Sequence, residues 1–510
     1  MYNYILSAAV HGMEILPVRV EADVSDGLPQ FIMVGFISAQ VKEAEDRVRT
    51  SFRNSHVPLP PKRITVNLSP ADVPKNGSRF DLPVALAILA ANGMIPPDSL
   101  KHVLAVGELS LDGGVNPITG VLPIAAKAME IGVKILIVPK ENFQEARSCG
   151  EMTVIGIATL LEAIAYFRNG TVPYPIDSPS DKNTNTQMPA LDISDVKGQR
   201  AAVRAAQIAV SGFHNLLLIG PPGSGKSMLA QRIPTILPKM TESERIEIAK
   251  IYSIAGLLDR EHPTIETRPF RNPHHTVSPQ ALAGGGKIPT PGEITLAHRG
   301  VLFLDEFPEF RRQTLEILRQ PLEDHEIVIS RISGAFRFPA HFLLLAAMNP
   351  CPCGSYPDMK RCTCSAGDIS SYINRISKPL LDRIDLCVEC PQISWGELTS
   401  SPGSVPGSAE IREQVEAVRR IQEKRFAGSG ICFNSEIPSS KTGEFCRMTA
   451  KAESILAQSY DSMRLSARVC HRVLKVARTI ADMAGAELIR PEDISEALMF
   501  RMIDRKYWRL

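Results

Sequence analysis

The chain has 510 residues, of which 44% are hydrophobic and 22% are charged, and its formal net charge is +2. This composition is ordinary for soluble globular proteins and excludes a fibrous or long disordered chain. The small net charge excludes a global attraction to nucleic acid or membranes, so any such contact requires local basic loops.

The cysteine content and the N-terminus indicate a cytoplasmic protein. Ten cysteines are few for a disulfide scaffold and suit a reducing compartment. The longest apolar run, 82–95, is too short to span a bilayer. The first residues lack the basic segment of a signal peptide. We therefore expect no membrane partner.

Two stretches rich in Pro, Ser and other polar residues, 171–190 and 399–408, predict linkers. At about 150 residues per domain the length predicts about three domains. The linkers divide the chain accordingly into domains at 1–170, 191–398 and 409–510.

The first predicted domain mixes strands and helices. Residues 63–68 alternate like a half-buried strand, and residues 134–139 are typical of a central strand. Residues 82–91 are almost wholly apolar, which predicts a buried helix. The pattern indicates an α/β domain.

The second domain opens with a phosphate-binding pattern. Residues 220–227 match G-x-x-x-x-G-K-[ST], after an apolar strand at 215–219 and before a helix at 227–237. Glycines let backbone N–H groups surround phosphate oxygens, Lys226 reaches the β- and γ-phosphates, and Ser227 ligates Mg²⁺. A chance glycine-rich turn is the alternative. The predicted ATP-binding residues are Gly220, Pro221, Pro222, Gly223, Ser224, Gly225, Lys226 and Ser227.

A long segment at 254–300 follows the helix of this loop. Between residues 268 and 300 its only acid is Glu293, and its basic residues are Arg268, Arg271, Lys287 and Arg299. A flexible basic loop suits contact with a DNA backbone, so Arg271 and Lys287 are candidate DNA contacts. Packing against neighbouring subunits is the alternative. Because adjacent histidines usually diverge, His274 and His275 indicate an interface or phosphate contact rather than a metal site.

Polar residues follow the next two predicted strands. A buried-type strand at 301–304 ends in Asp305 and Glu306. Asp305 is predicted to hold Mg²⁺, and Glu306 to polarise the attacking water as general base. Another strand, 342–347, leads to Asn349, which is predicted to orient the water or sense the γ-phosphate. A solvated acidic turn is the alternative for the acidic pair.

Four cysteines lie directly after Asn349, at positions 351, 353, 362 and 364. Four thiolates are a sufficient structural zinc set, and we predict that Cys351, Cys353, Cys362 and Cys364 bind Zn²⁺. The C-x-C spacing is tighter than usual, so reduced thiols in a local loop are the alternative.

Two arginines complete the predicted site. Arg383, between a helix and a strand, is predicted to reach the γ-phosphate of a neighbouring subunit, and nearby Arg375 is the alternative for this role. Arg468 starts an amphipathic helix and is predicted to close onto bound ATP. A surface ion pair is the alternative for either. Amphipathic stretches at 409–426 and 466–484, with 491–502, predict a helical lid domain.

The order of these motifs resembles AAA+ ATPases of the magnesium-chelatase branch. The segments 268–276, 281–286, 292–300 and 349–354 are similar to the ComM/YifB family of chelatase-like ATPases. That resemblance implies a hexameric ring that drives branch migration of recombination intermediates in natural transformation, with DNA and recombination proteins as partners. It also implies that 327–338 forms a hairpin that points into the ring pore, with Arg331 near its tip.

Residues 106–115 and 135–142 resemble the Lon protease domain, which raises a rival Ser–Lys peptidase function. Arg79 stands at the nucleophile position and Leu122 at the lysine position. A serine without a nearby base is a weak nucleophile, so Ser78 would need Lys127 as a substitute. A metal-inserting chelatase motor is a second alternative, and a non-catalytic scaffold is a third.

Overall fold

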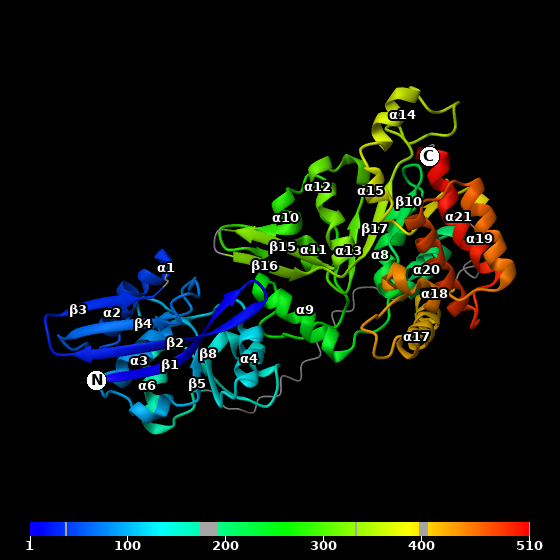
Figure 1. The fold of residues 1–510 in the computed structure, drawn as a ribbon. Coiled ribbons are helices and arrows are strands. Elements are labelled where there is room, and N and C mark those ends of the chain that lie inside the picture. The colour runs from blue at the N-terminus through cyan, green and yellow to red at the C-terminus, as the bar shows by residue number, and fades with distance from the viewer. Residues whose placement is uncertain (36–37, 174–190, 332–333, 397–405, 509–510) are drawn as a thin grey trace.

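In a computed structural model, residues 1–35, 38–173, 191–331, 334–396 and 406–508 are described (Figure 1). Most of the two predicted linkers, 171–190 and 399–408, lies outside these ranges, as does part of the predicted hairpin tip at 332–333. The N-terminal sheet and the C-terminal helices lie at opposite ends, with a second sheet between them (Figure 1). Within the described ranges, no helix has the length and apolar character that crossing a membrane requires.

The N-terminal sheet has seven strands in the order β3-β4-β2-β1-β5-β8-β9. Long antiparallel strands β1 and β2 form its middle, and β2 alternates buried and exposed residues, as expected for a sheet with one face toward a core. The strands are β1 Tyr2–His11, β2 Glu14–Ser25, β3 Gln30–Val34, β4 Arg63–Ser69, β5 Val103–Ala105, β8 Ile135–Pro139 and β9 Thr153–Ile157.

Helix α3, Asp81–Ala91, packs against β1 and β2, and every one of its residues is buried. Its nearly continuous apolar sequence explains this position, because a helix without a polar face is stable only inside a core. The predicted buried helix and the predicted strands at 63–68 and 134–139 are confirmed. Other helices here are α2 Ala44–Asn54, α4 Val121–Glu130, α5 Phe143–Arg147 and α6 Leu160–Asn169.

The central sheet is parallel, with the order β11-β14-β17-β10-β18. All residues of β10, β14 and β17 are buried, which matches their unbroken apolar sequences. The carboxyl ends of these strands meet at one edge of the sheet. The strands are β10 Leu216–Ile219, β11 Phe270–Arg271, β14 Val301–Leu304, β17 Leu343–Met348 and β18 Leu386–Glu389.

Helices and two small hairpins surround this sheet. The antiparallel pair β15–β16 confirms the predicted hairpin, and β12 pairs with β13 in the preceding segment. The longer elements are α7 Arg200–Gly212, α8 Lys226–Ile236, α9 Glu242–Ala255, β15 Glu326–Arg331, β16 Gly334–Pro339 and α14 Ala366–Ile373. The shorter ones are α10 Pro279–Ala283, β12 Gly284–Gly285, β13 Thr290–Pro291, α11 Glu293–Leu296, α12 Arg312–Glu316 and α15 Lys378–Leu381.

The C-terminal part is helical and packs on α7 and α8. The Ser466 hydroxyl accepts the Val469 N–H and so fixes the start of α20. The predicted α/β class with a helical C-terminal part is confirmed. Its helices are α17 Ser408–Arg425, α18 Thr442–Phe445, α19 Ala450–Ser462, α20 Ala467–Met483 and α21 Pro491–Trp508.

Among the described residues, the N-terminal part contacts the central part through α4 and through the β1–β2 turn. Helix α4 packs on α9, and the Ser253 hydroxyl donates to Glu145 Oε1 at 2.5 Å. The His11 ring at the β1–β2 turn stacks on Phe336 of β16, with centroids 4.0 Å apart. The hairpin β15–β16 belongs to the central part, and through Phe336 it also packs against the N-terminal part.

Candidate functional site

The phosphate-binding loop begins where β10, the second strand from one side of the sheet, ends. Gly223 and Gly225 have φ values of 75° and 88°, in the left-handed region that favours glycine. At Gly220 an added Cβ would lie 2.2 Å from the carbonyl oxygen of Cys390, so this close approach also needs glycine. The loop then continues directly into α8, whose N-terminus favours a bound anion.

Lys226 folds its ammonium group into this loop. Its Nζ donates to the carbonyl oxygens of Gly220 at 2.7 Å and Pro221 at 2.9 Å, and to Asn349 Oδ1 at 3.3 Å. Burial lowers the pKa of Lys226. The ammonium and the predicted sensor amide are thus in contact, at the place where phosphate oxygens are expected.

Ser227 and Asp305 also meet at this edge. The Ser227 hydroxyl donates to Asp305 Oδ2 at 2.6 Å and links the first turn of α8 to the end of β14. Hydroxyl and carboxylate oxygens are hard ligands that suit Mg²⁺ beside substrate phosphates. The two predicted metal ligands therefore fit the ion by chemistry and by mutual position.

Glu306 stands next to this pair in an unusual backbone conformation, with φ 51°. Its side chain is 56% exposed, and its Oε2 lies 3.0 Å from Nδ1 of His275. This carboxylate, directly after the buried strand β14, is therefore open to solvent, as a general base for water requires. The contact with His275 was not predicted, and the adjacent histidines were its only signal in the sequence.

The four predicted zinc ligands form one cluster. Their sulfur atoms all lie within 4.8 Å of one another, with 3.4 Å between Cys351 and Cys353 and 3.8 Å between Cys351 and Cys362. A tetrahedron with Zn–S bonds of about 2.3 Å has sulfur–sulfur edges of about 3.8 Å, so the donor set fits zinc. A Cβ added at Gly354 would lie 2.4 Å from Pro222, which shows that this cysteine loop packs against the phosphate loop.

Arg383 and Arg468 lie at the opposite edge of the sheet. Arg383 precedes β18, which runs parallel to β10, and so lies by the amino ends of the strands, away from the phosphate loop. Both arginines pair with Glu323, Arg383 at 2.7 Å and Arg468 at 3.5 Å. The prediction that Arg468 closes onto the ATP of its own chain does not fit this position, because the sheet separates it from Lys226.

The two arginine side chains differ in exposure. Arg383 is 5% exposed, whereas Arg468 is 53% exposed. Arg375 is the alternative to Arg383, and it pairs with Glu309 at 2.7 Å. Because Glu309 lies three residues after Glu306, this pair lies toward the carboxyl edge of the sheet, where the phosphate loop is. Glu323, which pairs with both arginines, was not predicted from the sequence.

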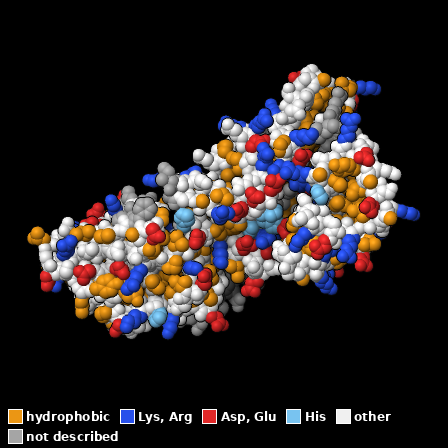
Figure 2. Space-filling model, in the orientation of Figure 1, with side chains coloured by type: hydrophobic (Ala, Val, Ile, Leu, Met, Phe, Trp, Pro, Cys, Tyr) orange, Lys and Arg blue, Asp and Glu red, His pale blue; other side chains and the backbone are white. Residues whose placement is uncertain are grey.

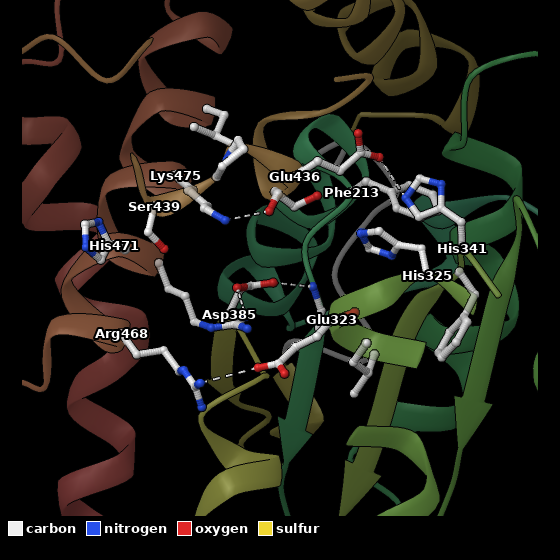
Figure 3. Close-up of a pocket in the computed structure, with 17 residues that line it drawn as sticks. Phe213, Glu323, His325, His341, Asp385, Glu436, Ser439, Arg468, His471 and Lys475 are labelled. Carbon is white, nitrogen blue, oxygen red and sulfur yellow. Dashed lines mark hydrogen bonds and ion pairs between the residues drawn. The ribbon is translucent and has the colours of Figure 1, made fainter. Parts of the chain in front are cut away.

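A cavity of about 580 Å³ opens beside Arg468, between this edge and α20 (Figure 3). One face of α20 lines it with four basic or titratable residues at helical spacing, Arg468, His471, Arg472 and Lys475. At its floor Asp385 is paired with Arg472 and accepts the Asn215 N–H. Burial would raise the pKa of Asp385, but Arg472 and His214 outweigh it and hold that pKa far below its ordinary value.

Most of the predicted basic loop is neutralised inside the chain. Arg271 pairs with Glu293 at 2.6 Å, Arg268 with Glu244 at 2.9 Å, and Arg299 with a glutamate of α9 at 3.1 Å. Arg271 is therefore not supported as a DNA contact, since long-range packing gave it an internal partner. Figure 2 shows Lys and Arg mixed with Asp and Glu over the visible face, without one dominant basic surface.

Two predicted basic residues stay exposed and lie near each other. Lys287 is exposed between β12 and β13, and Arg331 is exposed at the end of β15. Arg331 Nε donates to the carbonyl oxygen of Gly286 at 3.3 Å, so the loop and the hairpin share one tip. This loop–hairpin tip, Gly286, Lys287 and Arg331, is what remains of the predicted DNA surface.

Ser78 and Lys127, the residues that a Ser–Lys peptidase would need here, each have another partner. The Ser78 hydroxyl bonds to Glu108, and Lys127 pairs with Glu130 at 2.7 Å. Leu122 stands at the lysine position and has no basic side chain, and its backbone N–H donates to Glu145. These contacts agree with the sequence argument against a peptidase.

Comparisons with known proteins identify the family. Three family profiles match in succession: "Subunit ChlI of Mg-chelatase" over residues 20–142, "Magnesium chelatase, subunit ChlI" over 192–398, and "Magnesium chelatase, subunit ChlI C-terminal" over 406–501. Competence protein ComM of Haemophilus influenzae is 43% identical, with 99% of this chain and 98% of that protein covered. The chain belongs to the ComM/YifB family of magnesium-chelatase-like ATPases.

Further relatives agree with this ComM/YifB assignment. Uncharacterized protein YifB of Escherichia coli is 41% identical, over 98% of this chain and 96% of that protein. The Magnesium-chelatase 38 kDa subunit of Acidiphilium rubrum is 25% identical over 44% of this chain and 61% of that protein. A Lon protease of Roseiflexus castenholzii is 30% identical over 26% of this chain and 17% of its own, so that likeness is partial. The family supports an AAA+-type ATPase that uses ATP and Mg²⁺.

Proposed function

We propose that this ComM/YifB protein is an ATP-driven motor that works as a homo-oligomeric ring, hexameric by family resemblance. It acts on branched DNA, as a branch-migration helicase in recombination during natural transformation. The observation that carries the ATPase part is the assembly of Lys226, Ser227, Asp305 and Asn349 at one sheet edge, with Glu306 beside them. The DNA part is supported by the name of the relative Competence protein ComM and by the exposed loop–hairpin tip.

The chemistry follows from these positions. Lys226 and the loop N–H groups bind the phosphates, and Glu306 accepts a proton from the water that attacks the γ-phosphorus. Ser227 and Asp305 would hold Mg²⁺, which would supply charge neutralisation for the phosphate groups. Asn349, in contact with Lys226, reports the presence of the γ-phosphate to the end of β17.

The ring is supported by the position of the arginines. Arg383 and Arg468 share one edge of the sheet, on the side away from the phosphate loop of their own chain. Cationic side chains at such a place stabilise the transferring phosphoryl group only if it belongs to another subunit. A complete active site therefore needs two chains, and Arg383 and Arg468 act together in trans. Zinc held by the cysteine cluster would brace the phosphate loop.

The deciding experiment is migration of a labelled Holliday junction by the purified protein with ATP, beside Glu306→Gln. We expect product from the wild type and none from the variant. ATP hydrolysis that DNA does not change, without junction product, would contradict the DNA motor.

A magnesium-chelatase motor is the second candidate, favoured by the three matched family profiles. It predicts ATP hydrolysis that responds to porphyrin and not to DNA. Casein turnover that Ser78→Ala abolishes would instead support a peptidase.

A further inference from the structure

The contact between His275 and Glu306 has no part in the chemistry described above. Nδ1 of His275 lies 3.0 Å from Oε2 of Glu306, and the histidine is 30% exposed. Its ring also lies edge-on to Phe310, with centroids 6.4 Å apart, which holds the ring beside the glutamate. An oxygen that faces an imidazole nitrogen is less available to accept a proton from water.

His275 belongs to a short stretch that ends at the loop–hairpin tip. Three residues after it, the Ser278 hydroxyl accepts the Ala281 N–H at 3.1 Å and starts α10. Helix α10 runs into Gly284–Gly285, which pair with β13, and Gly286 then accepts from Arg331. These consecutive, internally bonded elements connect His275 to the tip, so we expect displacement of the tip to move His275.

We propose that His275 is a positioning residue that restrains Glu306, and that DNA bound at the loop–hairpin tip releases it. The DNA part of this inference rests on the proposed function. The tip presents the exposed cations Lys287 and Arg331, which suit a phosphate backbone. DNA that draws the tip toward itself pulls residues 275–286 away from Glu306. Hydrolysis is then slow until DNA is present.

The test is steady-state ATP hydrolysis by the full chain with Mg²⁺, with and without branched DNA, for His275→Ala. We expect the DNA-free kcat to rise about fivefold, the equivalent of one modest hydrogen bond, while the KM for ATP is unchanged. Stimulation by DNA should decrease by the same factor. An unchanged KM separates loss of the restraint from damage to the phosphate loop.

Two further variants test whether a rise in the DNA-free kcat comes from loss of the contact between His275 and Glu306. His275→Asn keeps an N–H group near the position of Nδ1 and should return the DNA-free rate toward that of the wild type. His274→Ala changes the adjacent histidine, whose Nδ1 hydrogen-bonds with the Thr276 hydroxyl at 2.9 Å and whose ring packs on His275 with centroids 4.1 Å apart. Because it leaves the contact between His275 and Glu306 in place, it should raise the DNA-free kcat less than His275→Ala does, and an equal rise would overturn the role of that contact. If His275→Ala is poorly folded by thermal unfolding, His275→Leu, which keeps side-chain bulk but has no N–H group, takes its place in the same assay with the same expected rise in the DNA-free kcat.

The outcomes separate the restraint from the DNA function. A DNA-free kcat that is unchanged or lower in His275→Ala overturns the restraint, whatever DNA does to the wild type. A faster variant beside a wild type that ignores DNA supports the restraint and overturns DNA as its signal. A faster variant with lost DNA stimulation supports both.

Discussion

The two edges of the central sheet carry opposite halves of the proposed chemistry. At the carboxyl edge Lys226 contacts Asn349, and Ser227 contacts Asp305, within a single chain. At the amino edge the arginines are held by a carboxylate, Glu323, and the phosphates that they would serve lie beyond the sheet.

This difference between the edges indicates how assembly of subunits would control ATP hydrolysis. One half of the site is preformed in every subunit, so nucleotide binding does not require a neighbour. In the proposed ring, the other half would act only when a second subunit brings its phosphate loop to Arg468. Substitutions at the two edges should therefore have different consequences for binding, turnover and complementation between subunits.

The largest expected effect is at the carboxyl edge. Glu306→Gln should lower kcat by about 1,000-fold because the general base is lost, while ATP binding stays near that of the wild type. Turnover and the binding of a fluorescent nucleotide measure the two quantities. Glu309→Gln, which changes the glutamate paired with Arg375, is the matched control. A large loss of nucleotide binding in Glu306→Gln would contradict the assigned role.

At the amino edge, Arg468→Ala should lower kcat by about 100-fold, as for loss of one transition-state donor. Mixing this variant with Glu306→Gln should restore part of the activity, because some interfaces then contain an intact glutamate and an intact arginine. The mixture's ATPase rate is compared with the sum of the two separate rates. A mixture that hydrolyses ATP no faster than the sum of the two separate variants would place Arg468 in the site of its own chain.

Asp385 allows the amino edge to be weakened without changing the phosphate loop. Asp385→Asn breaks a buried ion pair with Arg472 and should lower the free energy of unfolding at pH 7 by about 3 kcal/mol. The pKa of Asp385 is depressed in the folded state, so its stabilising contribution is present at neutral pH and is lost under acid. The difference between variant and wild type in denaturant unfolding should therefore shrink below about pH 4. A difference that grows under acid would contradict this assignment.

The smallest effect concerns the cysteine loop at the carboxyl edge. The protein should contain one zinc per chain by metal analysis, and Cys353→Ser should lose it. Because the loop packs on Pro222, the KM for ATP should rise about fivefold while kcat changes little. Cys432→Ser, an exposed cysteine outside the cluster, is the control. Absence of zinc from the wild type would remove this role.

The carboxyl edge was largely predictable from the sequence, and the amino edge was not. Each strand of the parallel sheet is a local apolar run, so the residue after it is placed at the same edge as its counterparts. That reasoning predicts Asp305 and Asn349 beside Lys226. The partners of Arg468 and Arg271 are Glu323 and Glu293, which no local pattern connects to them.

The sequence by itself determined the α/β class, the phosphate loop, the candidate Mg²⁺ ligands and the cysteine cluster, because these depend on short motifs and on the strands that carry them. Only the tertiary structure decided that Arg468 lies across the sheet from the phosphate loop, that most basic residues of 268–300 are neutralised, and that His275 faces Glu306. Those outcomes depend on contacts between residues distant in the chain, where ion pairing and packing select partners that composition and periodicity do not specify.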